Sequence, residues 1–184
     1  MERNKVILVD VNDNSLGYAD KMQAHEAGLL HRAFSIFIMR KFHDKTEILL
    51  QQRALTKYHC AGLWSNTCCS HPQPNDNLQH SALKRLEEEL GFKLNSITWV
   101  DSHIYQAQLE NSLIEHEFDH LFVNLLTQSE SDNLEVRPNP VEVNNIKWLS
   151  INEIEQALKS HPEQFTPWFE ATFFKVINKL SLTR

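Results

Sequence analysis

The stretch between residues 53 and 77 constrains the fold of this chain most. It is rich in Pro, Asn, Ser, Cys and His and shows no regular hydrophobic period. The segments on either side are clear: residues 47–52 have the pattern of a strand, and Leu78–Leu90 has the spacing of an amphipathic helix that Gly91 would end. Irregular segments of this length are uncommon inside a compact domain unless they carry function. We therefore expect a functional segment packed between a strand and a helix.

The remaining hydrophobic patterns predict further strands with helices between them. Ser150, followed three residues later by Glu153, is a capping box that predicts the start of a helix. Thr166 and Pro167 supply an N-cap and a first-turn proline for a last helix, whose buried stripe would include Phe169, Phe173, Val176, Ile177 and Leu180. The expected strands are residues 6–11, 34–39, 47–52, 98–109, 115–126 and 145–149. Together these elements predict one α/β domain with a mixed sheet over residues 1–184.

The charge and the cysteines limit the classes of function. A net charge of −6 gives no general attraction to nucleic acid or to an anionic membrane, so an anionic ligand would need local cations or a metal. Cys60, Cys68 and Cys69 are odd in number, and two are adjacent, which disfavours a disulfide framework. The first ten residues have too short an apolar run for a signal peptide, and no stretch approaches the roughly 18 apolar residues that span a bilayer. We expect a cytoplasmic protein.

Two carboxylates in the strand predicted at residues 115–126 are the first sign of chemistry. Side chains alternate along a strand, so Glu115 and Glu117 would share one face and His116 would point to the other. Two carboxylates among apolar neighbours repel each other unless a cation or a shared proton separates them. The alternative is an ordinary solvated strand face.

Histidine could supply the rest of a metal site. The chain has ten histidines, and His25, His31 and His71 lie near segments that could converge. Three imidazoles with two carboxylates form a ligand set suited to zinc, manganese or iron. Taken singly, each of these histidines is more often an ordinary polar or core residue than a metal ligand.

Cys69 lies two residues before His71. A thiol beside a cationic site would have a lowered pKa and could exchange protons. The alternative, which we favour for Cys68, is a small buried hydrophobe. The three cysteines with His59 and His71 could also form a structural zinc site, although the chain lacks a Cys-x-x-Cys pair.

The acidic run Glu87-Glu88-Glu89 could be a solvated helix face. However, residues 84–92 resemble the second half of the Nudix box, R-E-U-x-E-E-x-G-U, in which U is a bulky apolar residue. Glu88, Glu89, Gly91 and Phe92 fit, whereas Lys84-Arg85 replaces the opening Arg-Glu and Ser70 falls where the box begins with glycine. The resemblance therefore implies a Nudix-like α/β/α sandwich with a degenerate box at about residues 70–92, which argues against pyrophosphate hydrolysis.

A second resemblance covers nearly the whole chain. Residues 64–72, Trp-Ser-Asn-Thr-Cys-Cys-Ser-His-Pro, are similar to the W-[TS]-N-x-x-C-x-H-P signature of type 1 isopentenyl-diphosphate isomerases. Other matches follow in the order of that family: Ala24-His25, His31-x-Ala33-Phe34-Ser35, Gln52-Arg53-Ala54-Leu55-x-Lys57, Glu115-x-Glu117 and Thr166-Pro167-Trp168.

The resemblance implies roles for individual residues. Cys69 would be the catalytic thiol and Glu117 the opposing carboxylate, with Tyr105 assisting Glu117 and the ring of Trp168 over the substrate. One divalent ion (Mn, Zn or Mg) would be bound by His25, His31, His71, Glu115 and Glu117. Glu89 would hold a second ion, magnesium, that also touches the substrate diphosphate. The diphosphate itself would be bound by Lys21, Arg53, Lys57 and Arg85.

The implied reaction interconverts isopentenyl and dimethylallyl diphosphate, in isoprenoid biosynthesis, by protonation and deprotonation through a tertiary carbocation. The partner would be a small allylic or homoallylic diphosphate, with no nucleic acid and no membrane, and the chain would be a monomer or a weak homodimer. A Nudix-type diphosphate hydrolase is the alternative. A metal- or ligand-binding module without catalysis is a third reading.

Overall fold

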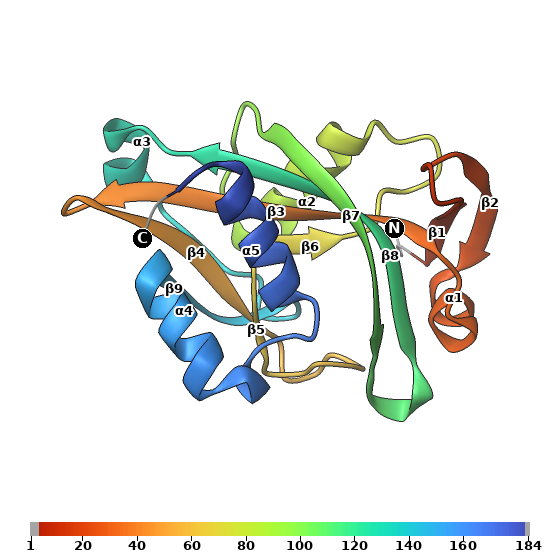
Figure 1. Cartoon of the computed structure of the whole chain (residues 1–184). Helices are drawn as coiled ribbons and strands as arrows, with labels where there is room; N and C mark the ends of the chain where they lie inside the picture. Colours follow the sequence, from red (N-terminus) through yellow and green to blue (C-terminus); the bar gives the residue numbers. More distant parts are fainter. Residues whose placement is uncertain (1–3, 183–184) are drawn as a thin grey trace.

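A computed structural model describes residues 4–182, so the outermost residues of the expected 1–184 domain lie outside the description. One mixed sheet of nine strands dominates the described chain (Figure 1). Among its pairings, β3 and β8 run parallel and the others are antiparallel. The strands are β1 (Lys5–Val9), β2 (Ser15–Asp20), β3 (His31–Phe42), β4 (Lys45–Arg53), β5 (Trp64–Ser65), β6 (Cys68–Ser70), β7 (Thr98–Gln108), β8 (Ile114–Leu125) and β9 (Val143–Ser150).

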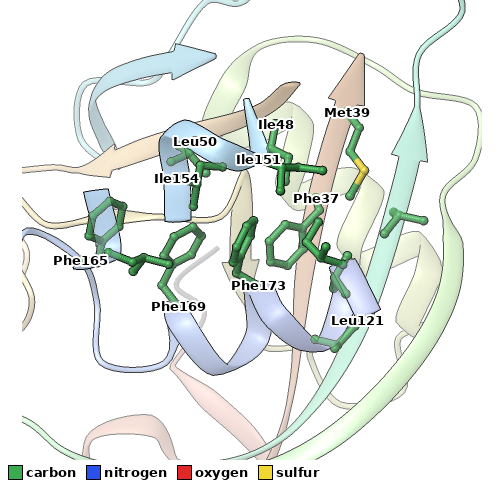
Figure 2. Close-up of a cluster of buried hydrophobic side chains, with 14 residues drawn as sticks. Phe37, Met39, Ile48, Leu50, Leu121, Ile151, Ile154, Phe165, Phe169 and Phe173 are labelled. Atoms are coloured by element: carbon green, nitrogen blue, oxygen red, sulfur yellow. The ribbon is translucent and has the colours of Figure 1, made fainter. Parts of the chain in front are cut away.

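Helices cover both faces of the sheet and make the sandwich expected from the sequence. The helices are α1 (Lys21–Ala27), α2 (Leu78–Leu90), α3 (Gln128–Asn133), α4 (Ile151–Ser160) and α5 (Phe169–Lys179). One apolar core lies between the sheet and α2, where Leu86 and Leu90 are fully buried. The other lies under α4 and α5, where Phe169 and Phe173 pack towards Phe37 and Leu50 (Figure 2). Within residues 4–182, no helix is long and apolar enough to cross a membrane.

The central strand β3 contributes to both cores because its side chains alternate between the two faces. Phe34, Ile36 and Ile38 belong to the core beneath α2, whereas Phe37 and Met39 belong to the core beneath α5. On the α5 side, the same alternation brings the polar residues His31 and Ser35 to the beginning of the strand. That end of the face is therefore free for a functional site.

The neighbouring strands β3 and β4 separate towards this end of the sheet. β4 pairs with β3 only near their hairpin, from Met39↔Ile48 to Phe42↔Lys45. Further back along β3, β6 takes its place and pairs Ser35 with Cys69. β4 runs away from β3 to pair with β5 and β9 (Figure 1). The segment after residue 53 thus folds between β4 and β3.

Several predicted boundaries are confirmed and others are wrong. The helix Leu78–Leu90 with its Gly91 cap and the capping box of Ser150 and Glu153 are as expected. β2, α1 and α3 were not anticipated, the segment 53–77 includes the short strands β5 and β6, and β3 begins earlier than residue 34. The last helix begins at Phe169, and Thr166 does not cap it. The Thr166 hydroxyl instead forms a 3.1 Å hydrogen bond with that of Ser65.

Candidate active site and metal centre

Four side chains from distant parts of the chain meet at the beginning of β3. Their ligand atoms all lie within 4.8 Å of one another, and they belong to His25, His31, His71 and Glu115. These residues come from α1, β3, the segment after β6, and β8. The parallel pairing of β3 with β8 sets His31 opposite Glu117, so Glu115 and Glu117 share the face of His31 as the alternation of the strand requires. His116 points away, and its ring pairs with the Gly28 carbonyl.

The histidine rings are oriented to present Nε2 to the cluster. Nδ1 of His31 donates a 2.7 Å hydrogen bond to the Leu29 carbonyl, which leaves its Nε2 without a proton in the neutral ring. Nε2 of His31 lies 3.2 Å from Nε2 of His71 and 3.6 Å from Glu115 Oε1. Nδ1 of His25 lies 3.2 Å from the Tyr58 hydroxyl. Holding one ring nitrogen in this way is how proteins orient a metal-binding imidazole.

The orphaned atoms of the cluster test whether a cation fits. Nε2 of His25 and Oε1 of Glu115 are buried and have no hydrogen-bond partner among the described residues, although they face each other at 2.9 Å. Burial holds the pKa of His71 well below its usual value, so its ring is neutral. Imidazoles converging on a buried carboxylate form an N/O ligand set. The cluster could therefore hold a divalent metal ion.

Glu117 lies at the edge of the cluster and joins it to Tyr105. Its Oε1 is 2.8 Å from Nε2 of His71 and 3.8 Å from Nε2 of His31. Its Oε2 accepts a 2.5 Å hydrogen bond from the Tyr105 hydroxyl. Burial, followed by the charges of Glu115 and Asp119, raises the pKa of Glu117 well above its usual value. Glu117 is thus a buried carboxyl group with high proton affinity, next to the four-residue cluster.

The adjacent cysteines point to opposite faces of β6. Cys68 is fully buried in the core beneath α2, as expected of a small hydrophobe. Cys69 packs with Tyr105 and Trp168 on the other face. Burial raises the pKa of the Cys69 thiol to about 12, so the lowered pKa expected from the sequence is wrong, and the group is protonated at neutral pH. The metal-ligand cluster found within residues 4–182 contains no cysteine, which gives the structural zinc alternative no support.

A pocket with a cavity volume of about 90 Å³ extends from the cluster towards α2. The ring of Trp168 forms part of the pocket wall. The Trp168 Nε1 donates a 3.1 Å hydrogen bond to the Ser65 hydroxyl, and the centre of the Trp168 ring lies 6.5 Å from that of Tyr105. Cys69, Glu117 and the Tyr105 ring line the same pocket. The residues expected for the chemistry are therefore neighbours around one cavity.

All four cations expected to bind diphosphate line this pocket, and two are held by a carboxylate that the sequence did not single out. The four are Lys21, Arg53, Lys57 and Arg85. Glu142 forms one ion pair with Lys57 and another, of 2.8 Å, with Arg85. Hydrogen bonds from these two cations overcome the effect of burial and lower the pKa of Glu142 to about 2.

Glu89 is the one member of the acidic run of α2 that is buried. Its Oε1 is 2.9 Å from Nε of Arg85, and its Oε2 accepts a 3.1 Å hydrogen bond from the amide of Gln51. Glu89 lines the pocket but does not belong to the His/Glu cluster. Any ion at this carboxylate would lie beside Arg85 and outside the four-residue cluster.

The sequence did not assign Tyr58 or Glu142, and it considered His59 only for a structural zinc. His59 is buried, with Nε2 at 3.8 Å from Glu115 Oε2 and Nδ1 at 3.5 Å from an Arg53 nitrogen. The position of His59 in the irregular segment, two residues after Lys57, was the one available signal for it. Glu142 lies far from every motif, in the loop before β9, and nothing in the sequence pointed to it.

The fold and the site define a class of protein. The family model of the NUDIX domain matches residues 29–169. Among solved structures, a Nudix hydrolase from M. smegmatis is similar with a TM-score of 0.58 at 14% identity, covering 97% of this chain and 98% of that chain. The MutT protein from Methanosarcina mazei has a TM-score of 0.61 at 14% identity, covering 84% of this chain and 96% of that one. At this identity the likeness shows the fold alone, a NUDIX fold.

Closer relatives narrow the class. An isopentenyl-diphosphate Delta-isomerase from Photobacterium profundum is 45% identical over 178 residues, which cover 96% of each chain. Another, from Pectobacterium atrosepticum, is 43% identical over 176 residues, covering 96% of this chain and 93% of the relative. The chain belongs to the isopentenyl-diphosphate Delta-isomerase family.

Proposed function

We propose that this chain interconverts isopentenyl diphosphate and dimethylallyl diphosphate and thereby serves isoprenoid biosynthesis. The observation that carries the proposal is the lining of one pocket. Cys69, the Glu117–Tyr105 pair and the Trp168 ring lie around the same cavity as four cations. A pair of proton-exchanging groups, an aromatic face and a cationic region are the parts that this reaction needs.

The reaction moves a double bond by one carbon. A proton adds to the terminal carbon of the alkene, and the electron pair of the π bond forms the new C–H bond, which leaves a tertiary carbocation. A C–H bond on the neighbouring methylene then breaks, its electron pair forms the new double bond, and the proton passes to a base. Cys69 and Glu117 reach the pocket from β6 and β8, the strands that flank β3. We assign proton donation and removal to these two groups, with roles that exchange when the reaction reverses.

The surroundings of this pair suit the cation. The π-face of an aromatic ring attracts positive charge, and the Trp168 ring is held in the pocket wall by Ser65. Tyr105 holds Glu117 by its 2.5 Å hydrogen bond. Both ring side chains also keep water from the reacting carbons, which would otherwise capture the cation.

His25, His31, His71 and Glu115, with Glu117 beside them, are the residues that would hold a divalent ion (Mn, Zn or Mg). When bound, such an ion lowers the proton affinity of nearby groups by its charge. The carboxyl group of Glu117 is close enough to the cluster to respond, since it contacts His71 at 2.8 Å.

The diphosphate group does not react and serves to bind the substrate. It would be bound by the cationic side chains of Lys21, Arg53, Lys57 and Arg85. Glu89, on the same side of the pocket, would bind a magnesium ion carried by the diphosphate.

We further propose one domain over residues 1–184 with a degenerate Nudix box at about 70–92. The unpaired cysteines suit a reducing compartment such as the cytoplasm, and we expect a monomer or a weak homodimer.

Proton NMR of isopentenyl diphosphate, incubated with the protein and magnesium in deuterated water, tests the function. We expect dimethylallyl diphosphate that has gained deuterium, because the added proton comes from an exchangeable group. Unchanged substrate from a folded, metal-loaded sample would contradict the proposal. Released phosphate would favour a Nudix-type hydrolase instead.

A further inference from the structure

Tyr58 contacts two parts of the site at once, and neither the motifs nor the proposed roles include it. Its hydroxyl lies 3.2 Å from Nδ1 of His25, and Lys21 Nζ lies 5.4 Å above its ring. The ring also stacks on the His25 ring, with centres 6.3 Å apart and planes inclined by 28°. One side chain therefore contacts a candidate metal ligand and a candidate diphosphate cation.

These two partners lie on one face of α1. Lys21 and His25 are four residues apart, which places them one above the other on a helix. α1 has only seven residues, too few for a helix that is stable on its own. Its position therefore depends on what packs against it, and the Tyr58 ring covers the face that carries both functional groups.

The hydrogen bond determines which nitrogen of His25 is available. If Nδ1 donates its proton to the Tyr58 oxygen, Nε2 keeps a free lone pair, and this is the atom that faces Glu115 at 2.9 Å. For His31 the same task falls to a backbone carbonyl, that of Leu29. For His25 it falls to a side chain, which substitution can remove.

Tyr58 is itself fixed to the hairpin that carries Glu115. The side-chain amide of Asn111, at the tip of the β7–β8 hairpin, donates a 3.5 Å hydrogen bond to the Tyr58 carbonyl. Glu110 accepts a 3.1 Å hydrogen bond from the backbone of Cys60. The segment that holds His25 and the strand that supplies Glu115 are thus connected independently of any ion.

We propose that Tyr58 is a positioning residue of the metal centre, which holds His25 in its metal-binding tautomer and keeps Lys21 in place for the diphosphate. The inference rests on the proposed function, because it assumes a metal ion at the His/Glu cluster. It assigns Tyr58 no contact with the reacting carbons.

The experiment compares Mn²⁺ binding by the wild type, Tyr58→Phe and Tyr58→Leu, measured from the electron paramagnetic resonance signal of free Mn²⁺. For Tyr58→Phe we expect a Kd for Mn²⁺ that is roughly 10- to 100-fold higher, the usual effect of losing such a partner. Saturating Mn²⁺ should restore kcat, and KM for isopentenyl diphosphate should stay near the wild-type value because the ring remains. Tyr58→Leu should additionally raise KM about two- to five-fold through loss of the cation–π contact.

Tyr18→Phe is the matched control, because Tyr18 is an exposed tyrosine on β2, and it should bind Mn²⁺ as the wild type does. Equal Mn²⁺ affinity of Tyr58→Phe and the wild type would overturn the inference. Equal KM of the two Tyr58 variants would overturn the role towards Lys21. A wild type that binds no Mn²⁺ would instead overturn the metal centre of the proposed function.

The unfolding temperature of the metal-free variants is a further control. Tyr58 is 37% exposed, so both variants should unfold at the wild-type temperature. A large fall in the unfolding temperature would indicate a merely structural role.

Discussion

The hydroxyl of Tyr105 donates a 2.5 Å hydrogen bond to Oε2 of Glu117, directly across the pairing of β7 with β8. Oε1 of the same carboxyl group is 2.8 Å from Nε2 of His71. Both oxygens of Glu117 are thus held, one by the phenol and one by a residue of the metal cluster. A carboxyl group held at both oxygens has a fixed orientation in the pocket.

Tyr105→Phe should lower kcat for isopentenyl diphosphate roughly 2- to 10-fold, since a typical hydrogen bond contributes about 0.5–1.5 kcal/mol. Steady-state kinetics at saturating metal would measure the change. KM should move little, because Tyr105 is not among the residues proposed to bind the diphosphate. A wild-type kcat would show that the carboxyl group does not depend on this bond.

The adjacent cysteines give a matched pair of variants. Cys69→Ala should reduce turnover by a factor of about 10² to 10⁴, because it removes a proton-exchanging group. Cys68→Ala should keep the wild-type kcat and lower the free energy of unfolding by about 1 kcal/mol, because its side chain is packed beneath α2. Turnover assays with urea unfolding would test both. The reverse pattern would show that Cys68, and not Cys69, takes part in the chemistry.

Removal of the metal should affect both activity and stability. A chelator should abolish turnover and lower the unfolding temperature, since an ion at 100 times its Kd stabilises the folded state by about 2.7 kcal/mol. Added Mn²⁺ or Zn²⁺ should reverse both changes. Glu115→Gln, which loses the buried carboxylate of the cluster, is the control and should show a much smaller response to the metal. Equal responses of the two proteins would place the ion elsewhere.

Phe173 should be among the most costly residues to truncate. It is fully buried between α5 and the sheet, stacked on Phe169 (Figure 2). We expect Phe173→Ala to lower the free energy of unfolding by about 3–5 kcal/mol in urea titrations. Val141→Ala, at a position 69% exposed, should change it by less than about 0.5 kcal/mol.

The ion pairs of Glu142 should make stability depend on acid pH. The pKa of Glu142 in the folded state is about 2, below its ordinary value of 4.5, so the stabilisation is present above pH 4.5 and is lost as pH falls through 2. Glu142→Gln should therefore cost about 1–2 kcal/mol at pH 7, allowing for partial solvent screening. Urea unfolding at pH 7 and at pH 3 would measure it. A wild-type advantage that does not shrink at pH 3 would contradict this account.

Much of the site could be predicted because strand alternation is a strong local rule. The common face of Glu115 and Glu117 follows from two-residue spacing alone, and the structure has it. The helix Leu78–Leu90 was equally clear, because its apolar spacing and Gly91 indicate the same end. Where short-range chemistry determined the structure, the sequence was sufficient.

Other features depend on long-range contacts that no local pattern encodes. Threonine followed by proline is typical of a helix N-cap, but the Thr166 hydroxyl forms a hydrogen bond with the Ser65 hydroxyl, 101 residues earlier in the chain. This tertiary contact therefore overrides the local signal. The Cys69 thiol was expected beside positive charge, whereas burial dominates its pKa. Glu142 could not be found either, since its role follows only from how close Lys57 and Arg85 come in the folded chain.

The two-sided use of β3 has a consequence for the lengths that natural variants of this chain can tolerate. A single residue inserted or deleted between His31 and Met39 would exchange the two faces beyond that point and send core side chains into the pocket. The hairpin tip at His43 and Asp44, where both residues are exposed, has no such constraint. Length polymorphism should therefore collect at the hairpin tip, while the strand keeps a fixed count.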